Sequence, residues 1–314
     1  MTRAAPGGRR GVAVRVGRAT WLAVAAASVV GLVAFTWPFA VRPGAVGGTQ
    51  VAPAVFGVLL LLVVAVVFAG LADGGMDAKA VAMLGVLSAV GAALRPLGSG
   101  TAGVELVFFT LVLAGRVFGP GFGFALGCTT LFTSALLTGG VGPWLPYQMF
   151  GAAWVGLFAG LLPPASGRRE VAMLAAYGAV SAYAYGFLLN LSFWPFVVDP
   201  QSGLAYLPGA SLAVNLHRYL VFDATTSLGW DTGRAVTNAL AIAVAGPAVL
   251  AVLRRAARRA SFDAPVRFVD HPGAEPAGER PKAEAAGDCG QAMAPRERSQ
   301  STVARSPSSR PVGM

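Results

Sequence analysis

Eight apolar runs, separated by short polar segments, make up most of the chain. They cover residues 19–40, 51–72, 77–94, 103–118, 121–138, 146–163, 170–196 and 232–253. Because an α-helix rises about 1.5 Å per residue, a helix needs roughly 17–25 residues to cross a bilayer. The pattern predicts an all-α polytopic membrane protein of about eight transmembrane helices, of which the fourth, fifth and sixth are short.

Two longer polar segments predict different structures. Residues 260–314 are rich in Pro, Ala, Ser, Gly and charge and nearly lack aromatic residues, which predicts a disordered cytoplasmic tail. Residues 197–231 contain Leu, Tyr, Trp, Asn and His. This composition favours a structured external loop or a short amphipathic helix.

Composition agrees with a membrane protein. Hydrophobic residues make up 55% of the 314 residues and charged residues only 12%, which excludes an ordinary cytosolic enzyme. Of the net charge of +10, five Arg fall in residues 1–19 and four in the Arg254–Arg259 cluster. We interpret both clusters as cytoplasmic anchors beside apolar runs, and we expect no nucleic-acid partner.

The positive-inside rule then predicts orientation. The predicted cytoplasmic segments carry most of the Arg; they are 1–18, 73–77, 116–120, 164–169 and 254–314. We therefore expect a protein of the bacterial cytoplasmic membrane with both termini on the cytoplasmic side. The first run follows a basic stretch, so a cleaved signal peptide is an alternative. Its apolar part, 20–35, is long and no A-x-A site follows, which favours a retained helix.

One acidic residue, Glu105, lies well inside an apolar run. An ionisable group in hydrocarbon is costly unless it is paired or hydrated. Arg95 precedes it across a short external loop, so a structural ion pair, a ligand contact and a proton-coupling site are all open. Proton coupling is the weakest of these, since no second acid is evident to relay a proton.

Three Gly and two Pro interrupt the apolar pattern between Thr138 and Gln148. Irregular backbone at membrane depth is tolerated where it is buried in protein or lines a cavity. An interfacial aromatic belt with a tight turn would explain the same residues. We expect an outward-facing pocket in the outer third of the bundle, and only small and aliphatic side chains in the inner half. The candidate substrate-binding residues are Arg95, Glu105, Trp144, Tyr147, Gln148, Asn190, Trp194, Asn215 and His217, although an isolated loop histidine is usually a surface residue.

Small residues recur at a spacing of four, which places them on one helix face. This suits packing within the chain or docking of another membrane protein. The stripes are Gly115, Gly119, Gly123 and Gly127; Ala152, Gly156 and Gly160; and Ala78 and Ala82 followed by Gly85, Ala89 and Ala93. No Walker A, H-E-x-x-H or G-x-S-x-G motif occurs, and the two Cys and two His form no metal pattern. We expect neither an enzyme nor a metal or cofactor site.

Residues 77–163 resemble the substrate-binding S component of energy-coupling factor (ECF) transporters. The resemblance rests on the small-residue-rich stretch 78–94, the short loop at Arg95, the Gly115–Gly123 turn (GRVFGPGFG) and the Gly-Pro-Trp-Leu-Pro-Tyr-Gln run that ends at Gln148. It implies a six-helix core over about 77–255, with both ends cytoplasmic. Residues 19–72 would be two extra N-terminal helices.

The resemblance also implies a mechanism. A vitamin or vitamin precursor, with cobalamin as one candidate, would be captured from outside beneath loops at about 95–103, 138–146 and 197–231. The subunit would then join a transmembrane scaffold and two ATPase subunits. The family's A-x-x-x-A docking motif matches Ala78 and Ala82, extended by Gly85, Ala89 and Ala93.

Two other functions stay open. One is a stand-alone transporter driven by protons through Glu105, weakened by the lack of an inverted repeat. The other is a non-transporting assembly protein whose small-residue stripes dock partners.

Overall fold

The computed structural model describes Val14, residues 17–40, 78–98 and 103–260, and positions 57, 58, 61, 64 and 65. These residues all belong to one unit of the chain, 1–265. The expected basic N-terminus (1–18), second span (51–72) and tail (260–314) lie wholly or mostly outside the described residues.

Within the described ranges the chain forms eight α-helices, one 3-10 turn and no strand. The elements are α1 (Arg18–Ala40), α3 (Ala78–Leu97), α4 (Val107–Phe118), α5 (Pro120–Thr138), α6 (Leu145–Leu161), α7 (Gly167–Val197), η1 (Pro200–Ser202), α8 (Leu212–Thr226) and α9 (Leu228–Ala260). Helices α1, α3, α5, α7 and α9 are each long and apolar enough to cross a membrane. The chain is therefore an all-α membrane-embedded protein.

Helices form at every expected apolar run within the described residues. Helix α4 has only 12 residues because 103–106 is not helical. Gly103 has φ +82°, and a Cβ there would lie 2.1 Å from the Trp230 carbonyl oxygen, so this segment passes α9 at backbone distance. Helix α8 fills the segment for which a structured loop or short helix was expected, and α9 begins at Leu228, four residues before the predicted run.

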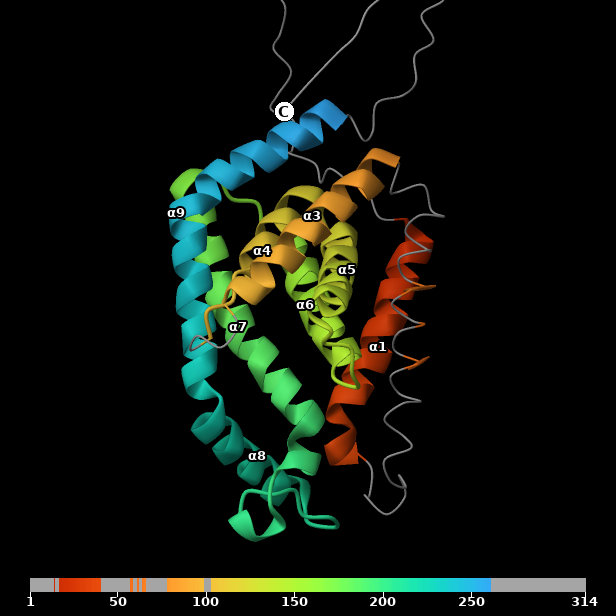
Figure 1. Ribbon diagram of the computed structural model, residues 1–314, viewed down its shortest axis with the longest axis vertical. Helices are drawn as coiled ribbons and strands as arrows, with labels where there is room; N and C mark the ends of the chain where they lie inside the picture. Colours follow the sequence, from red (N-terminus) through yellow and green to blue (C-terminus); the bar gives the residue numbers. More distant parts are fainter. Residues whose placement is uncertain are drawn as a thin grey trace, which may run out of the picture. The chain divides into compact units, whose positions relative to one another are not determined.

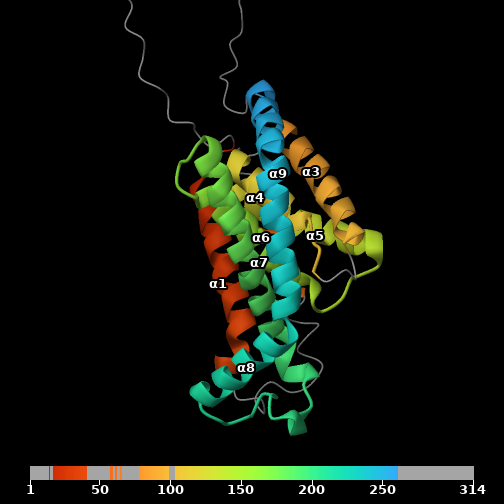
Figure 2. The same cartoon turned by 90° about the vertical axis from the view of Figure 1, so that its left-hand side faces the viewer.

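Helices α7 and α9 run side by side in both ribbon views (Figures 1 and 2). Helices α3 to α6 lie beside the half of this pair that contains the end of α9, where α4 contacts both α7 and α9 and α6 contacts α7; α8 lies beyond the opposite ends of α3 to α6 (Figure 1). Helices α5 and α6 approach most closely, since a Cβ on Gly156 would lie 2.2 Å from the Gly123 carbonyl oxygen. The stripes on α4, α5 and α6 therefore pack within the chain.

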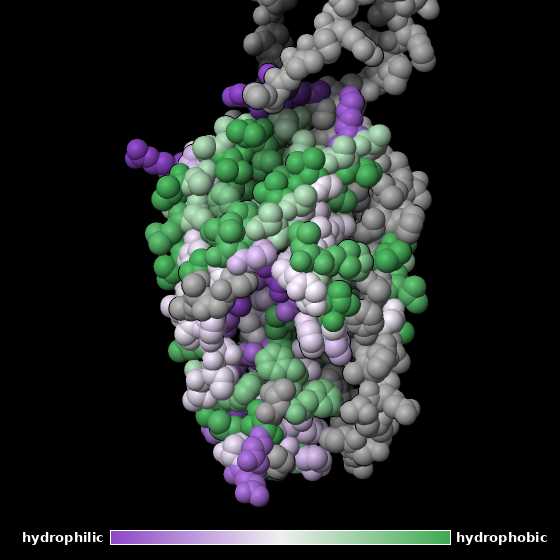
Figure 3. All heavy atoms as spheres, in the orientation of Figure 1, coloured by the Kyte–Doolittle hydropathy of each residue, from purple (hydrophilic) through white to green (hydrophobic). Residues whose placement is uncertain are grey.

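Figure 3 shows hydrophobic residues above a hollow, hydrophilic groups within that hollow, and further hydrophilic groups both at the opposite end and at the end that carries the last turns of α9. At this end the Glu170 carboxylate, only 2% exposed, accepts hydrogen bonds from Arg116 (2.9 Å) and Arg254 (2.6 Å). The half of the bundle remote from the predicted pocket thus contains paired charges, and the expectation of only small and aliphatic side chains there is wrong. Glu170 belongs to the first turn of α7, and its side chain points toward Arg116 of α4 and Arg254 of α9.

Candidate functional site

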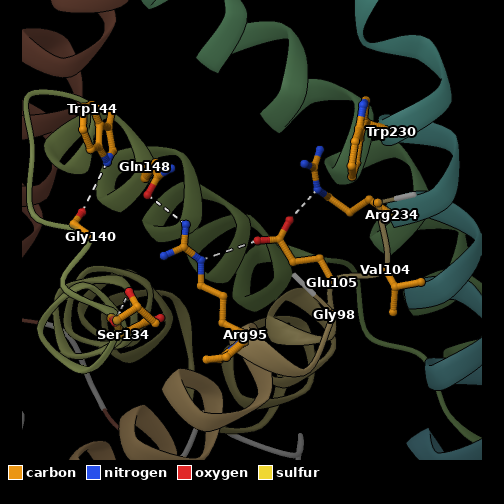
Figure 4. Close-up of a pocket in the computed structure, with 13 residues that line it drawn as sticks. Arg95, Gly98, Val104, Glu105, Ser134, Gly140, Trp144, Gln148, Trp230 and Arg234 are labelled. Carbon is orange, nitrogen blue, oxygen red and sulfur yellow. Dashed lines mark hydrogen bonds and ion pairs between the residues drawn. The ribbon is translucent and has the colours of Figure 1, made fainter. Parts of the chain in front are cut away.

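A cavity of about 370 Å³ lies where α3 and α5 end and where α6 and α9 begin. The short segment between α3 and α4 completes its wall. Four helices and this segment contribute side chains, so the cavity exists only in the folded bundle (Figure 4). Its volume is within the range of small-molecule sites.

A row of four polar side chains crosses the cavity (Figure 4). Arg95 of α3 donates through Nη2 to Oε1 of Gln148 on α6 at 2.9 Å. Glu105 Oε1 lies 3.7 Å from Arg95 Nε, and its Oε2 accepts a 2.7 Å hydrogen bond from Nε of Arg234 on α9. The row consists of an amide, a guanidinium, a carboxylate and a second guanidinium. Its contacts link α3, α6 and α9 to the segment before α4.

Arg234 has a second carboxylate partner. Its Nη1 donates to Asp231 Oδ1 at 2.6 Å, one helical turn earlier on α9. Asp231 is buried, and a Cβ on Gly186 of α7 would lie 2.0 Å from its Oδ1. Only glycine at this position leaves room for the acid, so α7 and α9 together place the Arg234 guanidinium.

Aromatic rings and a neighbouring amide fix the position of Arg234 further. Its Cζ lies 5.7 Å from the ring centroid of Phe108 and 5.2 Å from that of Tyr185, distances typical of cation–π contacts. Asn238, one turn later, donates to the Glu105 carbonyl oxygen at 2.9 Å. The charged row is thus held by packed side chains, which reduces its freedom before a ligand arrives.

Two indoles and a hydroxyl form the walls. Trp144 and Trp230 are 54% and 49% exposed and lie at opposite ends of the row (Figure 4). Trp144 Nε1 donates to the Gly140 carbonyl oxygen at 3.2 Å. Ser134 of α5 is fully buried, lines the cavity and has no hydrogen-bond partner for its hydroxyl. A ligand that enters would find aromatic surface and one hydroxyl in need of a partner.

Four of the nine predicted site residues meet in this cavity: Arg95, Glu105, Trp144 and Gln148. Tyr147 does not line it. The half-buried Tyr147 ring packs edge-on against Phe35 of α1, with centroids 5.1 Å apart. The next residue on α6, Gln148, points to the cavity instead, because successive helical residues lie about 100° apart.

The other four predicted residues lie in a second cluster near α8 rather than in the cavity. Asn190 donates to Asp223 Oδ1 at 2.6 Å, and Trp194 Nε1 donates to the Leu204 carbonyl oxygen at 2.9 Å. The Asn215 side chain bonds both the N–H and the carbonyl of Leu207, and His217 is exposed.

The length of α7 explains the separation. From Gly186, beside the charged row, to Trp194 the helix rises about 12 Å. The interpretation that all nine residues share one chamber is therefore wrong. Hydrogen bonds of Asn190, Trp194 and Asn215 instead link α7, the segment between α7 and α8, and α8 itself.

Sequence reasoning missed Trp230 and Asp231 because residues 197–231 were assigned to a loop, and it also missed Arg234, although this arginine lies within the predicted run 232–253. The spacing Asp231, Arg234, Asn238 is the signal that could have revealed them, since residues three and four apart share a helix face. A polar helix face that continues from the predicted loop into the run 232–253 indicates that this helix begins before residue 232. Ser134 carried no comparable signal.

The predicted docking stripe on α3 is exposed. Ala78, Ala82, Gly85, Ala89 and Ala93 are all exposed, whereas Leu84, Leu87 and Gly91 face the interior. A Cβ on Gly85 would meet no atom within 4 Å. This stripe differs from those on α4 to α6, which are buried against each other.

Comparisons of the chain with protein-family models, curated proteins and solved structures found no significant match.

Proposed function

We propose that this protein is the substrate-capture (S) subunit of an ECF-type importer in a bacterial cytoplasmic membrane. It binds a vitamin or vitamin precursor from outside, and a scaffold subunit with two ATPase subunits drives delivery. One observation carries the proposal: four polar side chains converge from α3, α6, α9 and the segment before α4 on one cavity with indole walls.

The position of the cavity supports uptake from outside. The Arg116–Glu170–Arg254 cluster and the Arg258 and Arg259 side chains belong to the opposite helix ends. By the positive-inside rule the arginine-rich ends face the cytoplasm. The cavity is then nearer the outer side, and both termini are cytoplasmic.

The size of the cavity bears on the substrate. At about 370 Å³ it is near the lower end of small-molecule sites, which favours a single-ring or two-ring compound over a corrinoid such as cobalamin. The two exposed indoles suit a flat ring, because stacked aromatic pairs gain stability beyond their buried area.

The exposed α3 stripe suits the scaffold contact. Small residues allow helix backbones to approach closely, and this face contacts no other described helix. Gly85→Leu would place a bulky side chain on the stripe, where its Cβ meets no atom of the protein itself. We expect loss of co-purification with scaffold and ATPases but unchanged ligand binding, and Val86→Leu, on the exposed surface beside the stripe, is the control.

Ligand binding tests the proposal without ATP. Purified protein in detergent is titrated with nicotinate, pantothenate, biotin, riboflavin and thiamin while tryptophan fluorescence is followed. Trp144 and Trp230 line the cavity, so a bound ring should quench their emission. Trp21→Phe, distant in sequence and on α1, should leave the signal change intact, whereas Trp144→Phe should reduce it. If no compound from this panel or from a wider panel of vitamin precursors binds, the proposal fails.

A proton-coupled secondary transporter is the second candidate, and one observation favours it. Arg234 bridges two acids, Glu105 and Asp231, which supplies the second acid that the sequence seemed to lack. In that case Glu105→Gln would abolish proton-driven uptake into vesicles that contain this protein alone, while ligand binding persists. Uptake that requires co-expressed ATPases would exclude this candidate.

A further inference from the structure

The charged side chains at the cavity compensate one another. Glu105 lies 2.7 Å from Arg234 Nε and 3.7 Å from Arg95 Nε, and Asp231 lies 2.6 Å from Arg234 Nη1. Two guanidinium groups thus face two carboxylates, and the net charge of these four groups is zero. A ligand with a net charge would leave water without meeting an opposite charge that is not already paired, and this costs free energy.

One side of the cavity carries no charge. In Figure 4, Ser134, Trp144 and Gln148 lie on one side of Arg95, and Arg234 lies on the other. These three residues come from α5, the turn before α6 and α6 itself, and all three line the cavity. We call them the uncharged side. A ligand without net charge can bind here without disturbing the ion pairs.

The Gln148 amide on the uncharged side has a defined orientation. A guanidinium group can only donate, so the atom that accepts from Arg95 Nη2 at 2.9 Å is the amide oxygen. The Gln148 Nε2 group then keeps two N–H donors, and neither has a partner among the described residues. The ligand atom that meets Nε2 must therefore be an acceptor, such as a carbonyl oxygen or a ring nitrogen.

The Ser134 hydroxyl is the second polar group of the uncharged side. Ser134 is 0% exposed, and its Oγ has no hydrogen-bond partner among the described residues. A buried polar group without a partner is costly, so a ligand that supplies the partner gains affinity. The indole of Trp144, 54% exposed, offers a flat apolar surface on the same side.

From these features we infer that the cavity takes an uncharged, planar heterocycle that carries an acceptor, such as a cyclic or aromatic amide. Its ring lies against Trp144, its carbonyl oxygen or ring nitrogen accepts from Gln148 Nε2, and a second polar atom pairs with the Ser134 hydroxyl. The paired charges form the opposite wall and hold the helices. The inference rests on the proposed function, because it names the substrate class of the same cavity.

The first experiment compares uncharged and charged probes at one thiol. A cysteine replaces Ser134, a change of one atom, in a Cys289→Ser background; the buried Cys128 stays. Reaction rates are measured for three methanethiosulfonates of similar size, which carry a hydroxyl, a sulfonate or a trimethylammonium group. Ala213→Cys on α8, exposed and outside the cavity, normalises their intrinsic reactivities. Thr138→Cys, one turn later on α5 and exposed, is the second reporter if Ser134→Cys does not fold.

We expect the uncharged reagent to react about three- to tenfold faster than either ion after normalisation at Ser134→Cys, and by a smaller factor at the exposed Thr138→Cys. A rate for the sulfonate or for the trimethylammonium reagent that equals or exceeds that of the uncharged one would overturn the inference. So would the absence of reaction at both reporters.

The second experiment uses two compounds that share a ring and differ in charge. Nicotinamide is uncharged and nicotinate is an anion, and each is titrated while tryptophan fluorescence is followed. Nicotinamide should bind at least about threefold more tightly, and Gln148→Glu, which removes both N–H donors, should weaken its binding about tenfold. If nicotinamide binds no more tightly than nicotinate, the inference fails. Tight binding of nicotinate, biotin or thiamin alone would keep solute capture and refute an uncharged ligand, whereas absence of any ligand would refute capture.

Discussion

Arg234 is the residue whose loss we expect to damage the bundle most. It lies 2.7 Å from a Glu105 oxygen and 2.6 Å from an Asp231 oxygen, and its side chain is 14% exposed. Arg234→Gln removes this cation from both carboxylates, of which Asp231 is buried and Glu105 is mostly buried at the cavity wall. Removal of one partner from a buried ion pair costs about 3–5 kcal/mol. For a unit of this size each kcal/mol lowers Tm by about 2–4 °C, so the expected fall is roughly 6–20 °C.

Helix α9 offers a matched control. Arg254 also donates to a buried carboxylate, that of Glu170, at 2.6 Å. Arg254→Gln leaves Glu170 with Arg116 at 2.9 Å, so the expected cost is only about 1 kcal/mol or less. The assay is thermal unfolding in detergent, followed by circular dichroism and by size-exclusion chromatography after heating.

The comparison of Arg234→Gln with Arg254→Gln tests whether the charge network stabilises the bundle. A double variant, Arg234→Gln with Asp231→Asn, removes one uncompensated charge and should recover part of the lost stability. If Arg234→Gln and Arg254→Gln lower Tm equally, or if Asp231→Asn gives no recovery, the described charge network does not stabilise the bundle.

Two further pairs of substitutions test the cavity and the helix packing. Ser134→Ala and Thr130→Val each remove a buried hydroxyl that has no hydrogen-bond partner, so both should raise the free energy of unfolding by about 1 kcal/mol. Only Ser134 lines the cavity, so in the fluorescence titration only Ser134→Ala should weaken binding, by about three- to tenfold; equal affinities would remove Ser134 from the site. Gly156→Ala places a Cβ 2.2 Å from the Gly123 carbonyl oxygen and should cost about 1–3 kcal/mol, measured as a lower Tm. Gly85→Ala meets no atom within 4 Å and should be neutral or stabilising by up to about 1 kcal/mol; similar losses in both would contradict the described packing.

The all-α membrane architecture could be predicted from the sequence because hydrophobic burial and backbone hydrogen bonding act locally in a bilayer. Runs of apolar residues near 20 in number must form helices, since every backbone polar group needs a partner within the segment. The described parts of the chain confirm this at runs such as 121–138 and 170–196, which correspond to α5 and α7. Part of the site could also be predicted, because charged residues such as Arg95 and Glu105 are rare in or beside apolar runs.

The other residues of the cavity could not be predicted, because the sequence pattern does not give the depth of each side chain within the bundle. Asn190 and Trp194 were expected at the level of Arg95, but along α7 they lie about 6 Å and about 12 Å beyond Gly186, toward the cluster near α8. Arg234 and Asp231 entered the site because α9 begins at Leu228 and packs on α7 through Gly186.

The amino-acid pattern by itself determined that this chain is a membrane-embedded helical protein and that its few charges are costly unless paired. Tertiary structure decided which of these charges meet. Helix packing sets the axial offset and rotation of each helix, and both depend on contacts between residues far apart in the chain, such as Glu105 with Arg234 and Gly123 with Gly156. Local preferences cannot specify those contacts, so the cavity and its two-arginine lining emerge only when the helices assemble.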